Sequence, residues 1–411
     1  MYSAVKTKNH NLKAKIVIVG AGPAGASLAI RLAKNDFSVA LIEREKFPRH
    51  KLCGEFMSPE CLAHFAELGV LDAMLAAGGD RISETVFYAP DGKNVTVPSK
   101  WFNNEQNALS LSRAEMDERL LEKARESGVE IFEETQATGI LTESGRICGV
   151  KLKRQGGETQ ELAADILIDA TGRASVLGKL AEKIEIQNSR FKIQNSERKS
   201  QQLKSGKQKR LVGFKTHLSG AAIEKSRCEI YFFRGGYGGL SRVENNLANH
   251  CFLIEAAIVK EFSGDADAIV EKLIFKNKRA AETLGIAAPV NDWLAVSVDG
   301  FGVRNLNPAK NLFAVGDSAA FIDPFTGSGM LMALESAKIL SAAIAENSFA
   351  PELIAARYRN LHREKFQNRL RLCALMRRAA FSPTFSSFLI RALSANESAR
   401  AFLARATRRS L

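Results

Sequence analysis

Three glycines near the amino terminus have the spacing of a nucleotide-binding loop. Gly20, Gly22 and Gly25 form a G-x-G-x-x-G motif that follows a β-branched run at residues 15–19 and precedes helix-forming residues. In such a strand–turn–helix unit the first glycine permits a tight turn, the second lets the backbone approach a pyrophosphate, and the third lets the helix pack on the strand. Glu43 ends the next strand-like run, where an acid can accept the ribose hydroxyl protons. The motif therefore predicts a dinucleotide site, with phosphate at the positive end of the helix.

Two other nucleotide-binding patterns are excluded. A Walker phosphate loop also has its glycines in a G-x-x-x-x-G spacing, but Ala26 and Ser27 stand where it needs Lys and Ser or Thr. No second G-x-G-x-x-G with strand and helix flanks occurs, because the glycine-rich run 235–239 lies among runs that alternate with period two. A separate NAD domain is therefore not expected.

A second segment with ligand-binding chemistry lies near residue 315. Gly316 and Asp317 follow the buried strand-like run 311–315, and Gly327 and Gly329 open a helix shortly afterwards. An Asp here can bind a polyol chain, and a helix N-terminus can stabilise negative charge on a reduced flavin ring. The alternative is a structural Asp that caps a turn. The segment suggests an extended ligand that carries a flavin.

These segments need a parallel β-sheet to bring them to one edge. Short apolar runs predict its strands at residues 15–19, 38–43, 129–132, 165–169 and 311–315. Helical patterns follow Gly25, start at the capping-box pair Ser112 and Glu115, and cover 330–345. Runs that alternate with period two predict antiparallel strands at 85–88, 94–97, 211–218, 228–233 and 249–255.

Composition and charge bound the protein class. The 411 residues are 45% apolar and 25% charged, which is typical of a folded chain with two or three domains. The net charge of +13 is uneven, because residues 351–411 carry +10 and residues 180–210 carry +6. The remainder is close to neutral, so the basic character belongs to two appendages.

Cysteine and histidine spacing predicts no metal site. The six cysteines form no C-x-x-C pair and the six histidines form no H-E-x-x-H motif. This usage fits a reducing compartment. The longest apolar stretch, residues 16–30, is too short to span a bilayer and contains a proline. We therefore expect a cytoplasmic protein.

The ordered motifs resemble one known family. The chain is similar to flavoproteins of the p-hydroxybenzoate hydroxylase-like superfamily, and most closely to geranylgeranyl reductase-like FAD-dependent oxidoreductases. The resemblance lies in residues 17–27, 48–55, 112–113, 169–172, 236–240, 314–318 and 324–330. Two departures limit it: residues 237–240 lack the tryptophan-containing aromatic run of many prenyl reductases, and Asp169-Ala170 replaces the Asp-Gly of hydroxylases. Trp101 and Trp293 are the only tryptophans, so the W-x-W-x-I-P signature of flavin halogenases is absent.

The resemblance implies FAD as the cofactor, with NAD(P)H or another reductant as a transient electron donor. FAD would be bound by the loop and strand-end residues and by two later segments: Gly20, Gly22, Pro23, Ala24, Gly25, Glu43, Arg44, Arg113, the backbone near Ala137, Gly316, Asp317, Gly327, Gly329 and Met330. No residue resembles a site of covalent flavin attachment. We expect noncovalent FAD.

The segment from Lys51 to Glu55 lies near the flavin ring in this family. Cys53 could give a proton to a substrate there, or could be a small buried packing residue, as free cysteines commonly are. Glu55 and His50 are weaker proton-donor candidates, and each could be an ordinary loop residue. Cys53 and Glu55 are the predicted catalytic pair.

The predicted architecture is α/β, with a Rossmann-like FAD-binding domain, an inserted antiparallel β-sheet substrate domain and a helical C-terminal tail. The FAD-binding domain would comprise residues 14–78, 108–180 and 292–350, and the substrate domain residues 79–107 and 211–291. Residues 181–210 contain a repeated Ile-Gln-Asn-Ser and predict a flexible basic insert. Residues 351–411 predict the basic helical tail.

Three functions follow from these residues. The leading hypothesis is an FAD-dependent oxidoreductase that reduces carbon–carbon double bonds of a lipophilic, isoprenoid or polyketide-like substrate. The first alternative is an FAD-dependent monooxygenase or hydroxylase. The second is a flavin-containing binding protein that docks through its basic tail. We expect no specific nucleic-acid partner, while the tail could contact an anionic membrane surface.

Overall fold

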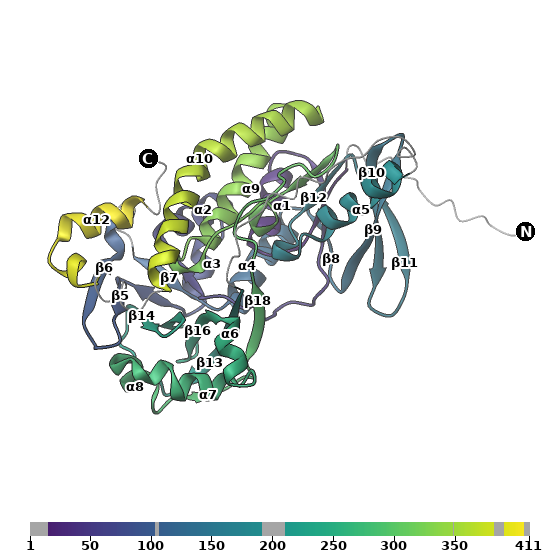
Figure 1. Ribbon diagram of the computed structural model, residues 1–411. Helices are drawn as coiled ribbons and strands as arrows, with labels where there is room; N and C mark the ends of the chain where they lie inside the picture. The colour runs from purple at the N-terminus through teal and green to yellow at the C-terminus, as the bar shows by residue number, and fades with distance from the viewer. Residues whose placement is uncertain (1–14, 103–106, 191–209, 348, 382–389, 407–411) are drawn as a thin grey trace, which may run out of the picture.

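The computed structural model describes residues 15–102, 107–190, 210–347, 349–381 and 390–406. Figure 1 shows two sheet systems with a helical layer above them: helices α1, α9 and α10 lie in the upper part, and a large sheet with α6–α8 forms the lower part. This arrangement confirms the predicted α/β class with added antiparallel strands and C-terminal helices.

A five-stranded parallel sheet forms the nucleotide-binding half. Its order is β20-β12-β1-β2-β8, with bounds Leu312–Ala314, Ile166–Asp169, Lys15–Val19, Ser38–Ile42 and Glu130–Phe132. The strands read as continuous apolar runs because both faces are buried. Their carboxyl ends, where parallel α/β folds bind ligands, meet at one edge.

Different layers cover the two faces of this sheet. Ile16 and Ile18 point into a core shared with helices α1 (Pro23–Ala33), α4 (Arg113–Glu126) and α9 (Gly329–Glu346). Val17 and Val19 point the other way, onto a three-stranded sheet and helix α5 (Val176–Arg190). That small sheet, formed by β9 (Thr135–Glu143), β10 (Arg146–Arg154) and β11 (Thr159–Ala163), was not predicted from the sequence.

The second half is an eight-stranded sheet of order β17-β13-β16-β15-β14-β5-β6, with β18 also paired to β13. The bounds are Ala288–Pro289, Leu211–Ser219, Ala248–Glu255, Gly236–Arg242, Arg227–Phe233, Glu84–Tyr88 and Asn94–Pro98, with β18 at Leu294–Val298. The predicted hairpin of β5 and β6 is confirmed. The expectation of purely antiparallel pairing is wrong at one place, because β14 and β5 run parallel. They come from distant parts of the chain, so no hairpin dictates their direction.

Smaller elements join the two halves. A sheet of β3 (Phe56–Met57), β7 (Ala108–Ser110) and β4 (Asp80–Ile82) lies beside helices α2 (Pro59–Leu68) and α3 (Leu71–Ala76). Helices α6 (Ala256–Glu261), α7 (Ala266–Lys272) and α8 (Lys278–Leu284) cover the outer face of the large sheet. The remaining short elements are η1 (Ser99–Trp101), η2 (Gly172–Ala174), η3 (Ile274–Lys276), η4 (Gly316–Ser318), η5 (Pro324–Thr326), β19 (Gly302–Val303) and β21 (Ala320–Phe321).

The C-terminal region is helical and packs on the core. Helix α10 (Pro351–Ala380) runs along α9, and the buried Tyr358 hydroxyl donates to the Ala314 carbonyl at 2.9 Å. Arg369 on α10 pairs with Glu335 on α9 at 3.0 Å. Helix α12 (Glu397–Ala406) lies beyond, near β6. The first half of α10 is therefore an integral layer, not a free appendage.

The predicted flexible insert needs one correction. Residues 181–190 form the second part of helix α5, whose Leu177 and Ala181 pack in the core under β9 and β10. Polar composition misled the prediction because the apolar residues Leu177 and Ala181 are enough to anchor the start of the helix. The rest of that insert, residues 191–209, lies outside the described residues.

Candidate active site

The glycine loop has the geometry that its sequence predicts. Gly20 has φ +104°, and a Cβ on it would overlap backbone atoms of Ala170. A Cβ on Gly25 would overlap the backbone of Gly20. Gly22 differs, because the nearest atom to a Cβ there is Arg113 Nη2 at 3.8 Å. Gly20 and Gly25 therefore permit close packing, while Gly22 keeps an open surface for a ligand.

Glu43 lies beneath the loop at the end of β2. Its Oε2 accepts from the Ala21 N–H at 2.9 Å and its Oε1 from the Glu45 N–H at 3.1 Å. The carboxylate is buried, with Arg49 Nη2 3.6 Å from Oε2. These contacts fix both the loop and the acid. A ribose contact from Glu43 remains a prediction.

Two other predicted cofactor residues contribute less through their side chains. Arg44 is mostly exposed and pairs with Glu45 at 3.1 Å. Ala137 is buried in β9 among residues that include Val19 and Ile42, so only its backbone could meet a cofactor. Contacts of Arg44 and Ala137 with FAD remain predictions.

Arg113 provides a positive charge beside the open glycine. Its Nε and Nη2 donate to the two carboxylate oxygens of Asp117 at 2.9 and 2.6 Å, and Arg49 Nη1 donates to the same carboxylate at 2.8 Å. Burial lowers the pKa of Arg113, but the Asp117 carboxylate raises it by more, so the pKa of Arg113 lies above its usual value. Arg113 Nη2 is also the nearest protein atom to a Cβ on Gly22, so the positive charge of this guanidinium faces the loop. A pyrophosphate fits that charge.

The second predicted segment packs directly against the glycine loop. Gly316 has φ +59°, and a Cβ on it would lie 2.8 Å from Ala24 Cβ. This close approach brings Asp317 to the loop. Burial raises the pKa of Asp317, although Arg173, Arg113 and Arg304 act in the opposite direction. Among the described residues, none donates a hydrogen bond to this carboxylate, which suits a polyol ligand.

The start of helix α9 completes a surface for the cofactor that we call the cradle, formed by residues 20–25, Arg113, Asp317 and residues 327–330. Gly327 has φ +60° and ends η5, and Met330 is buried in the first turn of α9. A Cβ on Gly329 would meet nothing within 4 Å. Open backbone at Gly22 and Gly329, with cationic Arg113 and acidic Asp317 nearby, fits FAD. The residues present would therefore hold this cofactor.

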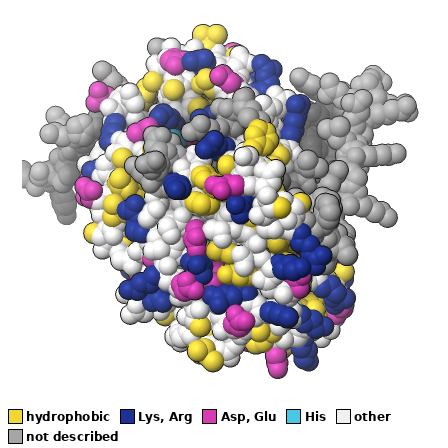
Figure 2. Space-filling view, turned by 90° about the vertical axis from the view of Figure 1, so that its left-hand side faces the viewer, with side chains coloured by type: hydrophobic (Ala, Val, Ile, Leu, Met, Phe, Trp, Pro, Cys, Tyr) yellow, Lys and Arg dark blue, Asp and Glu magenta, His cyan; other side chains and the backbone are white. Residues whose placement is uncertain are grey.

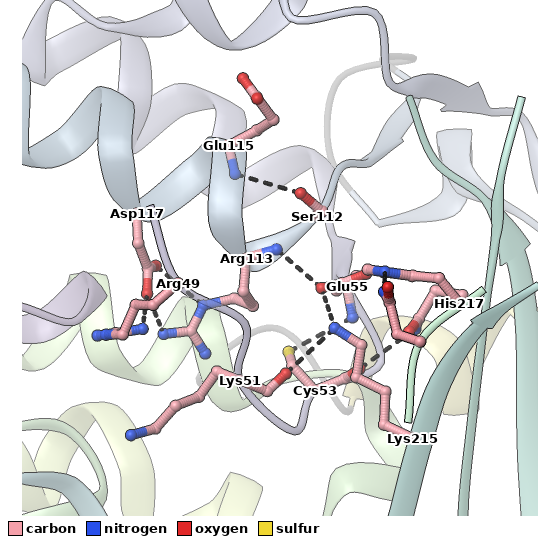
Figure 3. Close-up of polar contacts among 12 residues, drawn as sticks. Arg49, Lys51, Cys53, Glu55, Ser112, Arg113, Glu115, Asp117, Lys215 and His217 are labelled. Atoms are coloured by element: carbon pink, nitrogen blue, oxygen red, sulfur yellow. Dashed lines mark hydrogen bonds and ion pairs between the residues drawn. The ribbon is translucent and has the colours of Figure 1, made fainter. Parts of the chain in front are cut away.

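Loop 50–55 lies between this cradle and the large sheet (Figure 3). The fully buried Glu55 carboxylate is hydrogen-bonded by three donors: the backbone N–H of Arg113 at 2.8 Å, His217 Nε2 at 2.7 Å, and Lys215 Nζ. Burial raises the pKa of Glu55, but His217 and Lys215 together hold it below its usual value. Glu55 is therefore ionised at neutral pH and cannot itself be a general acid there.

Cys53 lies on the cradle side of the same loop. Its Sγ accepts from the Glu55 N–H at 3.4 Å, and its carbonyl accepts from Asn249 Nδ2 at 3.2 Å. The Arg113 guanidinium interacts electrostatically with the sulfur. Cys53 is partly buried and packs against the core of the nucleotide-binding half. This position is compatible with proton donation, which remains a prediction.

Sequence reasoning missed Lys215 and His217. Both are buried on β13, two residues apart, so they project from the same face of the sheet. The third candidate, His50, stacks edge-on against His217 with ring centroids 5.4 Å apart. Burial, Lys215 and His217 lower the pKa of His50. The signal available in the sequence was a Lys and a His at alternate positions of a strand that begins with an apolar run.

An open cleft of about 640 Å³ reaches this cluster from outside. It is lined by His50, Lys215, Thr216, His217, Pro289, Val290, Asn291, Asp292 and Leu294. Pro289, Val290 and Leu294 are its apolar lining residues, and the β13 residues Lys215, Thr216 and His217 are polar. The cleft gives solvent a route to the Glu55 cluster.

The inner face of the large sheet changes character along its strands. Register aligns His217, Asn249, Ser241 and Cys228 in one row across four strands. Two residues along, Lys215 aligns with Cys251, Gly239 and Ile230, and the next row is Gly213, Leu253, Tyr237 and Phe232. A polar row therefore gives way to an aromatic row, with Lys215 between them.

Comparison with known proteins identifies the family of the chain. The family model "FAD binding domain" matches residues 13–359. Digeranylgeranylglycerophospholipid reductase 1 of Methanococcoides burtonii is 27% identical over 376 residues, which cover 89% of this chain and 84% of that protein.

Two solved structures share the fold. A geranylgeranyl bacteriochlorophyll reductase-like protein of Thermoplasma acidophilum is 18% identical with a TM-score of 0.73, covering 96% of each chain. A triple mutant of a flavin-dependent brominase is 18% identical with a TM-score of 0.77, covering 96% of this chain and 95% of that one. The chain belongs to the FAD-binding domain family, as a geranylgeranyl reductase-like FAD-dependent oxidoreductase.

Proposed function

We propose that this oxidoreductase reduces carbon–carbon double bonds of a lipophilic, isoprenoid or polyketide-like substrate. The observation that carries the proposal is an aromatic wall next to the predicted flavin segment. Phe325 lies two residues before Gly327, and its ring centroid is 5.1 Å from Tyr237, 5.8 Å from Phe232 and 5.9 Å from Phe87. An apolar substrate would bury its surface against this wall.

The aromatic wall is held in place by polar contacts behind it. The Tyr237 hydroxyl donates to Asp323 Oδ1 at 2.9 Å, and the same oxygen accepts the Phe325 N–H at 2.9 Å. Asp323 thus fixes both rings relative to each other. Phe232 and Tyr237 are 4% and 6% exposed, so a substrate would have to displace the side chains that cover them, such as Phe381 and Ile390.

The chain's own residues have defined tasks in such a reaction. Bound FAD would deliver two electrons, as a hydride equivalent, to one carbon of the double bond. The aromatic row would orient the alkene and exclude water, Arg113 would hold the pyrophosphate, and Cys53 would give a proton to the second carbon. Glu55, which is ionised, positions its neighbours.

The named relatives support the lipophilic substrate class. The Methanococcoides burtonii protein is named for reduction of a digeranylgeranyl lipid. NAD(P)H or another reductant would supply electrons transiently. A monooxygenase is the alternative activity, because the solved structures with this fold include a probable FAD-dependent monooxygenase of Pseudomonas aeruginosa.

Separated half-reactions test the proposal. The FAD-loaded protein is reduced with dithionite under anaerobic conditions and mixed with prenyl or polyketide-like alkenes. We expect flavin reoxidation and a product two hydrogens heavier, seen by mass spectrometry. Rapid reoxidation by oxygen with oxygen incorporated into an added substrate, and none by any alkene, would favour the monooxygenase. Reoxidation by neither would favour the flavin-containing binding protein.

We also propose peripheral membrane contact through the C-terminal region. None of the helices that the structure describes is both long and apolar enough to cross a bilayer. Phe402 on α12 is 61% exposed, and Arg400 and Arg405 lie on the same helix. However, Figure 2, which views the molecule from the side where α12 lies in Figure 1, shows basic and acidic side chains interspersed.

Vesicle sedimentation tests this contact. The protein is mixed with anionic and with neutral phospholipid vesicles at low and high salt. We expect salt-sensitive binding to anionic vesicles only, at about 1 kcal/mol per engaged basic residue. Equal sedimentation with both vesicle types, or none with either, would remove the proposed contact.

A further inference from the structure

The buried cluster around Glu55 has more polar groups than the anchoring of a loop requires. Lys215, His217 and Glu55 are each at most 3% exposed, and the carboxylate receives a hydrogen bond from both side chains. Burying an ion pair costs desolvation energy that apolar residues would avoid. A second role for these groups would account for that cost.

The hydrogen bonds assign a protonation state to the cluster. Asn291 Nδ2 lies 3.4 Å from His217 Nδ1, and an amide nitrogen can only donate. Nδ1 of His217 is therefore the acceptor, and its Nε2 carries the hydrogen that is donated to Glu55. With His217 neutral and Glu55 ionised, the Lys215 ammonium holds the transferable proton.

The cluster has access to water on one side. Lys215, His217 and His50 all line the open cleft, so solvent reaches them without crossing the cofactor cradle. His50 lies at the mouth as the more exposed member, with its ring against His217. A proton lost from the cluster can be replaced from this cleft.

The other side of the cluster reaches the predicted reaction centre. Lys215 Nζ donates to the Lys51 carbonyl at 3.2 Å, two residues before Cys53 in the loop. Lys215 also lies opposite Cys251 in the sheet, and Cys251 interacts electrostatically with Cys53. Burial raises the pKa of Cys251 to about 12, so it stays a neutral thiol. Lys215 therefore lines the cleft and also contacts the loop that carries Cys53.

We propose that Lys215, held by Glu55 and His217, forms a proton reservoir that reloads Cys53 from the open cleft. This inference rests on the proposed alkene reduction. When the Cys53 thiol has given its proton to the substrate carbon, the Lys215 ammonium returns one to the thiolate. The neutral amine then takes a proton from water in the cleft. Glu55 and His217 are positioning residues throughout.

The tautomer of His217 tests the resting state without any turnover. Protein labelled with ¹⁵N in its histidine rings is measured by NMR as wild type, as Glu55→Gln and as His217→Gln, which assigns the signal. We expect His217 to be the Nε2–H tautomer in wild type and a mixture in Glu55→Gln. An Nδ1–H tautomer or an imidazolium in wild type at neutral pH would overturn the reservoir.

Chemical rescue tests the role in proton supply. His217→Gly opens space beside the cleft, so added imidazole can replace the side chain. Reoxidation of the reduced, FAD-loaded variant by an alkene should be slowed roughly tenfold or more under multiple turnover and be restored by imidazole. The control is His250→Gly, a buried histidine on the outer face of the same sheet, where imidazole should have no effect.

Lys215 itself is tested in a charge-balanced background. Lys215→Met alone leaves the Glu55 carboxylate without its ammonium partner, so the double variant Lys215→Met/Glu55→Gln keeps the buried site neutral. We expect this variant to fold and bind FAD while repeated alkene turnover slows. Wild-type turnover in the double variant, or equal rescue of both glycine variants, would overturn the proposal. If no alkene reoxidises the reduced wild-type protein, the reductase function is refuted. The tautomer of His217 then tests the proposed resting state of the Glu55 cluster independently of that function.

Discussion

The two sheets place their functional side chains in different ways. At the edge of the parallel sheet, Gly20, Gly22 and Gly25 lie within six consecutive residues and Glu43 ends the adjacent strand. On the large sheet, His217, Asn249 and Ser241 align in one row only because three strands pair in one register. The first site depends on local turn geometry and the second on long-range pairing.

This difference explains how each half responds to change. In the cradle, a side chain added at a glycine would contact the ligand or the protein backbone directly, because the site is formed by main-chain groups. On the inner face of the large sheet, side chains carry the chemistry, and each can be removed while its strand remains paired. We therefore expect all-or-none effects in the cradle and graded effects on the sheet.

The largest effect is expected from Gly22→Val. A Cβ on Gly22 meets no protein atom closer than 3.8 Å, so the apoprotein should fold, while the branched side chain occupies the space of the pyrophosphate. We expect loss of FAD from the purified protein, with affinity reduced by about 100-fold or more, measured by flavin absorbance and isothermal titration. Gly139→Val on β9 is the control. Normal flavin content in Gly22→Val would show that this loop does not bind the cofactor.

The cradle was predictable because its signal is contiguous. The glycine spacing, the capping box at Ser112 and the strand before Gly316 each carry their meaning within a few residues. The geometry then confirms the cap, since Ser112 Oγ accepts the Glu115 N–H at 3.2 Å. Local rules sufficed where main-chain conformation makes the site.

The cluster of Glu55, Lys215 and His217 was not predictable, because its members lie far apart in the sequence. No pattern within β13 states that Lys215 would face Glu55, which lies 160 residues earlier. The ionised state of Glu55 also depends on that pairing, so its predicted role as an acid could not be judged from composition. The parallel pairing of β14 with β5 was not predicted either, because the pairing of strands that are distant in the sequence is a long-range property.

The next effect concerns Cys53, where the two sheets meet. Cys53→Ser keeps the size of the side chain but raises the pKa of the donor by several units. We expect FAD binding and dithionite reduction to persist while alkene reduction slows by about 10²–10⁴-fold. Stopped-flow absorbance measures each half-reaction, and Cys148→Ser on β10 is the control. Equal alkene rates in wild type, Cys53→Ser and Cys53→Ala would leave Cys53 a packing residue.

A smaller effect is expected when the buried charges behind the cradle are unbalanced. Asp117→Asn leaves Arg113 and Arg49 without their shared carboxylate, and removing one partner of a buried ion pair costs about 3–5 kcal/mol. Denaturant unfolding of the apoprotein should show this loss. The exposed Asp72→Asn on α3 should change stability little. An unchanged midpoint in Asp117→Asn would mean that solvent already screens these guanidinium groups.

The smallest effect compares the two halves through buried histidines in acid. His64 lies beneath the nucleotide-binding helices and His250 lies on the outer face of the large sheet. Burial, together with Arg31 for His64, lowers the pKa of each to about 4. Because the folded-state pKa lies below the unfolded value of about 6.5, the unfolded state takes up a proton first, and each histidine destabilises the fold progressively as pH falls from 6.5 towards 4.

Each histidine should therefore cost about 2 kcal/mol of stability at pH 5 relative to pH 8. His64→Gln and His250→Gln should each remove that part of the pH dependence, measured by urea unfolding across the pH range. Since the Glu55 contacts join the halves, we expect one unfolding transition that both variants shift alike. Two separate transitions, one sensitive to each variant, would show that the parallel sheet and the large sheet unfold independently and that the shared loop does not couple them.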